Sequence, residues 1–183
     1  MVRKCKIKEK QPFQFYAWSD GSGDWFHPQR PGGSAYIIYS TEDGTEYKRA
    51  SMGFRHTTHN RMELLAIVSI VNSLPQNSSV LIHTDSQYCI LALQDGNPQK
   101  NLDLVNLYKD IVEKKKLKVI LTWVRGHDGD PNNEECDRMA RAAFAEVAYG
   151  KPKPEPKPLP PDTIVVPVDN IKPKKKRSTK KKK

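Results

Sequence analysis

A stretch in the first half of the chain, Thr57 to Ala66, places a carboxylate at the start of an apolar helix. The apolar run that follows continues until a proline ends it. We expect Asn60 to cap this helix, because an asparagine side chain accepts hydrogen bonds from the free N–H groups of a first turn. Glu63 then shares one helical stripe with four apolar residues, Ile67, Ile70, Val71 and Leu74.

Glu63 therefore lies on a face suited to burial, where an unpaired carboxylate costs on the order of several kcal/mol unless a cation or hydrogen bonds compensate. Three aspartates are placed to join it. Asp20 and Asp85 each close a predicted strand, and Asp137 lies early in the last predicted helix. The ends of such elements meet at one edge of an α/β sheet. Four carboxylates gathered there would repel one another, and Mg²⁺ or Mn²⁺, which prefer oxygen ligands, would remove that penalty.

The order of the predicted elements indicates an α/β fold. Three strand patterns come first and helices then alternate with strands, which predicts a mixed five-stranded sheet flanked by helices. Glu42-Asp43-Gly44 is a hairpin turn signal, and Asp130 with Pro131 marks the start of the last helix. The predicted strands are residues 13–22, 35–40, 46–54, 80–84 and 117–124, and the predicted helices are 61–74, 86–93, 102–115 and a segment from 131.

The charge of the chain is concentrated at its C-terminal end. Of a net charge of +10, residues 151–183 carry +9, with twelve Lys and Arg against three Asp and Glu. We therefore expect a flexible N-terminus over 1–12, one domain over 13–149 and a disordered, Pro/Lys-rich basic tail over 150–183. A polycation of this kind suits a nucleic acid backbone. A solubilising end, or a nuclear-import signal at Pro173–Arg177, are the alternatives.

The three cysteines, Cys5, Cys89 and Cys136, match no disulfide framework or zinc motif. Their odd number fits a reducing compartment, and Cys136 is expected to be a small packing residue beside Asp137. The basic N-terminus lacks the apolar core of a secretory signal, and no apolar stretch approaches the ~20 residues of a membrane span. We expect a cytoplasmic protein with no membrane association, and nuclear import is an alternative if its source is eukaryotic.

Six sequence blocks occur together in one order and spacing. They are Asp20-Gly21-Ser22, Pro31-Gly32-Gly33, Thr57 to Ala66, Thr84 to Tyr88, Val124 to His127 and Asn132 to Ala142. Over residues 13–146 the chain resembles the type 1 ribonuclease H family. The resemblance implies the ribonuclease H-like fold with strand order 3-2-1-4-5. It also implies a monomeric endonuclease that hydrolyses the RNA strand of RNA/DNA hybrids and leaves 5′-phosphate and 3′-hydroxyl ends.

The resemblance also assigns roles to residues. Two Mg²⁺ ions about 4 Å apart, for which Mn²⁺ can substitute, would be held by Asp20, Glu63, Asp85 and Asp137. His127 would assist proton transfer or product departure, a task that suits its near-neutral pKa. Contacts with the hybrid would come from Gly21, Ser22, Gly23, Thr58, His59, Asn60 and Gln87.

The chain departs from the family pattern at several places. His59 stands where many members have Asn. Tyr39 stands where some members have an Arg that binds phosphate. The segment Gly21–Gly33, with Trp25 to His27, is longer than usual, and the basic helix and loop of many bacterial members shrink to Gln94–Asn101. Two other readings are open: a non-catalytic hybrid-binding module, which need not keep all four acids, and a different nuclease or strand-transfer enzyme of the same fold. In transposases and integrases the glutamate typically follows the last strand.

Overall fold

Five strands form one mixed sheet in the computed structural model, which describes residues 13–96, 98, 100–126 and 129–150. Their order is β3-β2-β1-β4-β5, as predicted. The hairpins β1/β2 and β2/β3 are antiparallel, whereas β4 pairs in parallel with both β1 and β5. The strands are β1 (Phe15–Gly23), β2 (Gly32–Ser40), β3 (Glu46–Phe54), β4 (Ser79–Thr84) and β5 (Lys118–Trp123).

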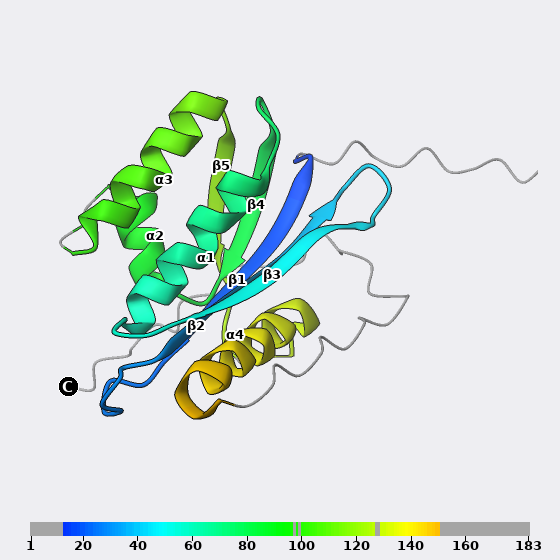
Figure 1. Ribbon diagram of the computed structural model, residues 1–183. Helices are drawn as coiled ribbons and strands as arrows, with labels where there is room; N and C mark the ends of the chain where they lie inside the picture. The colour runs from blue at the N-terminus through cyan, green and yellow to red at the C-terminus, as the bar shows by residue number, and fades with distance from the viewer. Residues whose placement is uncertain (1–12, 97, 99, 127–128, 151–183) are drawn as a thin grey trace, which may run out of the picture.

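Four helices cover the two faces of this sheet. Figure 1 shows three of them on one face and α4 on the other. The predicted stripe of Ile67, Ile70 and Val71 is fully buried between α1 and the sheet. On the opposite face, Cys136 is buried in a second apolar cluster with residues of β1 and β2, as expected for a packing residue. The helices are α1 (His59–Ser73), α2 (Gln87–Leu93), α3 (Leu102–Lys115) and α4 (Pro131–Tyr149).

Two glycines of the sheet let α4 approach its backbone closely. A Cβ at Gly33 would lie 1.9 Å from the carbonyl oxygen of Ala140, and a Cβ at Gly53 would lie 2.5 Å from that of Ala143. Both contacts are with helix backbone, which cannot move aside as a flexible side chain can. The glycines therefore set the height of α4 above the sheet, and with it the position of Asp137.

The start of α1 differs from the prediction. Thr58, and not Asn60, is the N-cap, and its Oγ1 accepts a hydrogen bond from Arg61 N at 3.3 Å. Both residue types cap helices well, and the earlier one is in the extended conformation that a cap needs. The helix thus begins at His59, and Asn60 is exposed in its first turn. The predicted cap of α4 is confirmed, since Asp130 Oδ1 accepts from Asn132 N and Asn133 N at 2.9 and 3.1 Å.

The connection between β1 and β2 is shorter than the predicted span of 21–33. The antiparallel register continues through Ser22 opposite Gly33 and Gly23 opposite Gly32, so only residues 24–31 form the loop. The other predicted strands and helices occur within a few residues of their expected ends. Among the described residues, no helix has both the length and the apolar character required to span a membrane. The predicted N-terminal segment, the tail beyond Gly150, Cys5 and His127 lie outside the described residues.

Candidate active site

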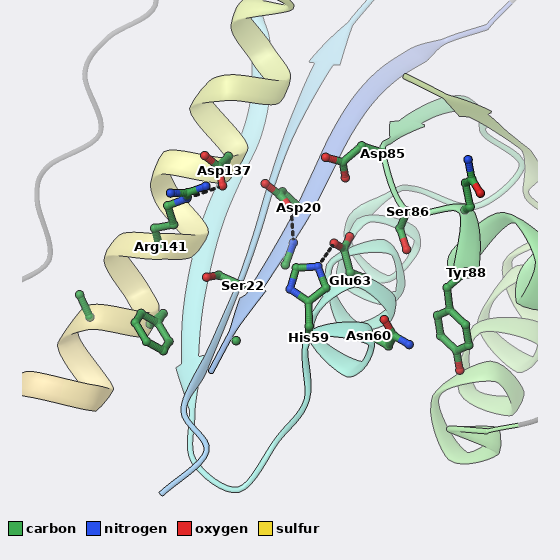
Figure 2. Close-up of a pocket in the computed structure, with 15 residues that line it drawn as sticks. Asp20, Ser22, His59, Asn60, Glu63, Asp85, Ser86, Tyr88, Asp137 and Arg141 are labelled. Carbon is green, nitrogen blue, oxygen red and sulfur yellow. Dashed lines mark hydrogen bonds and ion pairs between the residues drawn. The ribbon is translucent and has the colours of Figure 1, made fainter. Parts of the chain in front are cut away.

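The ends of β1 and β4 and the first turns of α1 and α4 meet at one edge of the sheet. There they line an open pocket of about 810 Å³, within the size range of ligand-binding sites. Figure 2 shows Asp20, Glu63, Asp85 and Asp137 around it. The parallel pairing of β1 with β4 causes this convergence, because it brings the carboxyl ends of the two strands side by side.

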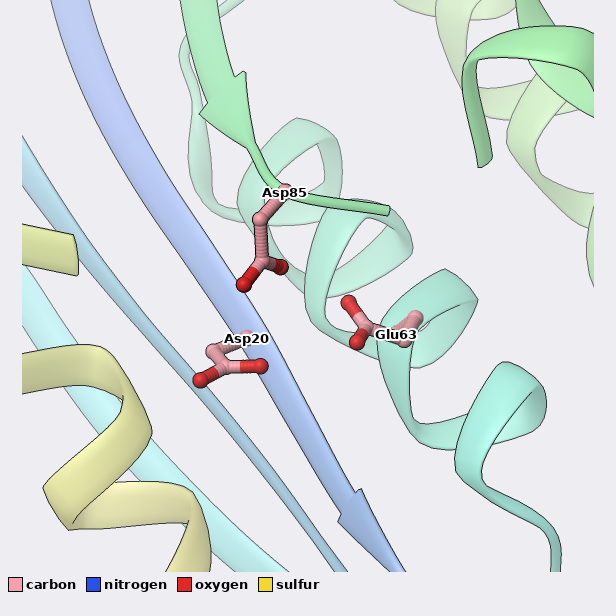
Figure 3. Close-up of side chains that lie close together, drawn as sticks. All are labelled: Asp20, Glu63 and Asp85. Carbon is pink, nitrogen blue, oxygen red and sulfur yellow. The ribbon is translucent and has the colours of Figure 1, made fainter. Parts of the chain in front are cut away.

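Three of the acids are close enough to share an ion. One carboxylate oxygen from each of Asp20, Glu63 and Asp85 lies within 4.8 Å of the others, and Figure 3 shows the three side chains turned toward one another. Asp20 and Glu63 are only 5% and 2% exposed, whereas Asp85 is half-buried. Buried carboxylates at this separation repel strongly in a medium that water screens poorly.

Gly21 allows the end of β1 to touch the first turn of α1. A Cβ there would lie 2.4 Å from Glu63 N and 2.8 Å from Met62 C, both backbone atoms. The N–H of Gly21 also donates to Asp20 Oδ1 at 2.7 Å. The glycine thus holds Asp20 and Glu63 face to face, a reason for this residue type that does not depend on any ligand.

Only one of the two carboxylate oxygens of Glu63 has a side-chain partner among the described residues. His59 Nε2 lies 3.0 Å from Oε1, as Figure 2 shows by a dashed line. Oε2 is buried with no hydrogen-bond partner among the described residues. A buried acceptor left in this way is costly unless something outside the protein chain satisfies it. An open carboxylate oxygen beside two further carboxylates fits a hard divalent cation.

Burial and mutual repulsion raise the pKa values of the two buried carboxyls, Asp20 and Glu63. Burial, and then the charges of Glu63, Asp85 and Asp137, raise the pKa of Asp20 to about 9. Burial also raises the pKa of Glu63, although His59 opposes the shift. The hydrogen bond to Glu63 in turn raises the pKa of His59. Without a cation the protein resists carrying all of these charges at once.

Asp137 borders the pocket but is not one of the three acids that cluster. Its Oδ1 accepts a hydrogen bond from Arg141 Nε at 2.7 Å, one helical turn along α4. Sequence reasoning did not select Arg141, which also lines the pocket and brings a cation to the acids. The contacts Asp137–Arg141 and His59–Glu63 both have i,i+4 spacing on a helix, which is the signal that could have revealed them.

Most of the residues expected to contact substrate also line the pocket. They are Gly21, Ser22, Gly23, His59, Asn60 and Gln87, joined by Ser86 and Tyr88, which sequence reasoning did not select. Thr58 instead caps α1. Tyr39 is buried against Trp18, so its side chain cannot replace a phosphate-binding arginine.

His127 itself lies outside the described residues, but Gly126 before it lies directly against Asp85. A Cβ at position 126 would be 2.6 Å from Asp85 Oδ2. Trp123, at the end of β5, donates from Nε1 to the carbonyl oxygen of Asp85 at 3.0 Å. The segment that leads to His127 is therefore packed against the acidic cluster.

Comparisons with known proteins agree with this architecture. A family model described as RNase H matches residues 13–145. A Ribonuclease H from Campylobacter concisus is 40% identical over 117 residues, which cover 60% of this chain and 79% of the relative. A Ribonuclease H from Lachnoclostridium phytofermentans is 34% identical over 134 residues, 64% of this chain and 84% of the relative.

A third relative, named Ribonuclease HI, comes from Synechocystis. It is 35% identical over 130 residues, which cover 62% of this chain and 78% of the relative. The matched region contains the whole sheet and all four acids of the pocket. The strand order of the sheet is also the one predicted for this family. The chain therefore belongs to the ribonuclease H family, whose members are endonucleases of the hydrolase class.

Proposed function

We propose that the pocket hydrolyses the RNA strand of RNA/DNA hybrids with the help of divalent metal ions, leaving 5′-phosphate and 3′-hydroxyl ends. One observation carries the proposal: Glu63 Oε2 is buried without a partner among the described residues, within a cluster formed with Asp20 and Asp85. A purely structural carboxylate cluster would gain nothing from this arrangement, because each buried charge adds to the repulsion.

Asp20, Glu63 and Asp85 would hold one Mg²⁺ or Mn²⁺ ion, and Asp137 together with Asp20 would hold a second. Bound there, such ions supply charge stabilisation at the phosphodiester and an activated water. Arg141 would neutralise Asp137 in the free protein, so the second ion competes with an existing ion pair. We therefore expect the second position to bind its ion more weakly than the first.

The protein side chains would select and orient the substrate. Asn60 and Gln87 are exposed residues of the pocket that contains Glu63, with amide groups that can both donate and accept hydrogen bonds. Such groups suit the 2′-hydroxyls of the shallow minor groove, which distinguish RNA from DNA. His59 would fix the orientation of Glu63 through the contact at Oε1 and leave Oε2 free for the metal.

A cleavage assay with three labelled duplexes tests this function. The full chain with Mg²⁺ is expected to cut the RNA strand of an RNA/DNA hybrid and to leave RNA/RNA and DNA/DNA intact, and EDTA should stop the reaction. Asp85→Asn should abolish cutting while hybrid binding persists. The matched control is Asp110→Asn on the exposed side of α3, which should cut normally. Full activity in EDTA, or in Asp85→Asn, would contradict the proposal.

A further inference from the structure

The loop between β1 and β2, residues 24–31, exposes two adjacent aromatic side chains. Trp25 is 62% exposed and Phe26 is 93% exposed, more than any other large apolar side chain among the described residues. Scattered apolar residues on a surface need no explanation, but a contiguous apolar patch usually marks a binding surface. These two side chains therefore require a reason for facing water.

Backbone contacts hold this loop in a defined shape. Asp24 Oδ1 accepts hydrogen bonds from Phe26 N at 2.8 Å and from His27 N at 3.3 Å. Across the base of the loop, Asp24 N donates to the carbonyl oxygen of Pro31 at 3.1 Å. The aromatic rings are thus presented outward by an ordered turn, which lowers the entropy cost of binding to them.

A positive charge lies beside one of the exposed rings. The guanidinium of Arg30 lies 5.1 Å from the centre of the Trp25 ring, which restrains that ring and leaves a cation beside it. The carbonyl oxygens of Gln29 and Arg30 accept from His56 N at 2.8 Å and from Thr57 N at 3.0 Å, so the backbone that follows the exposed Arg55 lies beside the loop. Exposed aromatic rings with a cation beside them complement a nucleic acid strand, which offers bases and phosphates together.

The loop continues directly from the active-site pocket. Gly23, at the end of β1, lines the pocket, and the loop begins at the next residue. The His27 ring lies 6.1 Å from that of Tyr149, which lies 6.1 Å from that of Phe144, and Phe144 also lines the pocket. In Figure 1 the loop is the blue turn near the orange C-terminal end of α4.

We propose that the β1–β2 loop binds an unpaired base of a single strand that continues from the hybrid in the pocket. This inference rests on the proposed function. Bases inside a duplex are already stacked on one another, whereas unpaired bases can stack on aromatic side chains whatever their sequence. Trp25 and Phe26 provide the stacking surface and Arg30 meets the phosphate. The favoured substrate is therefore a hybrid that adjoins single-stranded nucleic acid, not a blunt one.

The test compares blunt hybrids with hybrids of the same length that carry a short single-stranded extension, placed in turn on each strand and at each end. Binding to the full chain is measured in EDTA, where hydrolysis is suspended. At least one extended hybrid is expected to bind on the order of tenfold more tightly than the blunt one. The double variant Trp25→Ala/Phe26→Ala should lose most of this preference and still cut the blunt hybrid at the normal rate.

Two further variants separate stacking from general damage. Tyr47→Ala removes another exposed aromatic near the opposite end of the sheet and should keep the preference for the extended hybrid. Trp25→Phe should also keep it, but should lose the quenching of tryptophan fluorescence that stacking on Trp25 produces in the unmodified protein.

Equal binding of blunt and extended hybrids by the unmodified chain would overturn the proposal, as would an undiminished preference in the double variant. Equal binding by the unmodified chain is also the result expected if the loop instead contacts another protein. A chain that cut no hybrid at all would contradict the proposed function, and the binding comparison would still decide the role of the loop.

Discussion

At the scale of single residues, the pocket is a set of carboxylates that the fold holds close together although they repel one another. Asp20 and Glu63 are buried. Gly21 allows them to lie close together, because any larger residue at this position would clash with the backbone of α1. His59 offsets part of the charge of Glu63. Such a site trades stability of the metal-free protein for metal affinity.

Asp20→Asn is expected to stabilise the metal-free protein. The carboxyl of Asp20 ionises near 3.8 in the unfolded chain, but its pKa in the fold is about 9. The folded state therefore holds an extra proton between these values, and the free energy of unfolding falls as pH rises through that interval. Asparagine removes this loss and keeps an oxygen for Gly21 N.

Thermal unfolding in EDTA at pH 8 checks this expectation. The Asp20→Asn variant should melt higher by roughly 2 to 8 °C, corresponding to about 1–2 kcal/mol, and with a weaker dependence on pH. Mg²⁺ should raise the melting temperature of the unmodified chain but not that of the variant. A variant that melts lower than the unmodified chain in EDTA would show that Asp20 is not under electrostatic strain.

At the scale of elements, the position of α4 decides whether Asp137 reaches the pocket. Gly33→Ala would place a Cβ 1.9 Å from the carbonyl oxygen of Ala140 and must push the helix outward. We expect a loss of about 1–3 kcal/mol, as for overpacked cores, together with a fall in hybrid cleavage. Urea denaturation and cleavage rates measure the two effects. A variant with unchanged stability and activity would mean that α4 is not held by this contact.

The end of α1 depends on one lysine from α3. Lys115 Nζ donates to the carbonyl oxygens of Asn72 at 2.6 Å and Leu74 at 2.9 Å, which end the helix. Lys115→Met should therefore reduce the free energy of unfolding by about 1–2 kcal/mol without changing cleavage. Lys114→Met, at the exposed neighbouring position, is the control and should be neutral. Equal stability of the two variants would argue against a capping role.

The elements could largely be predicted from the sequence, because alternation and helical periodicity report burial directly. The start of α1 could not, since Thr58 and Asn60 are both good caps and only tertiary packing selects between them. The acids of the pocket were predictable from their places at element ends. The contacts His59–Glu63 and Asp137–Arg141 were not predicted, because i,i+4 spacing allows such a pair but the rotamers decide whether it forms.

At the scale of the whole molecule, charge is divided between a nearly neutral body and a basic end. Residues 1–150 have nineteen Lys and Arg against eighteen Asp and Glu, whereas residues 151–183 carry +9. The connection between α2 and α3, residues 94–101, contains a single basic residue, Lys100. We therefore expect residues 151–183 to supply most of the electrostatic attraction to nucleic acid.

A chain that ends at Gly150 tests this expectation. It should bind hybrid more weakly at low salt, with a shallower dependence of affinity on salt, because fewer counterions are released. The cleavage rate at saturating hybrid should not change. A full-length chain with the Lys and Arg residues of 151–183 replaced by Gln separates charge from length and should behave like the truncated one. Identical affinity and salt dependence in all three chains would leave the basic residues without a role in binding.

The central claim is that Asp20, Glu63 and Asp85 together bind a divalent cation. Crystals of the full chain grown with Mn²⁺ and measured at the manganese absorption edge test it most directly. We predict an anomalous peak bounded by oxygens of the three carboxylates, with Glu63 Oε2 among the ligands. No peak there, at a Mn²⁺ concentration that supports cleavage in solution, would contradict the account.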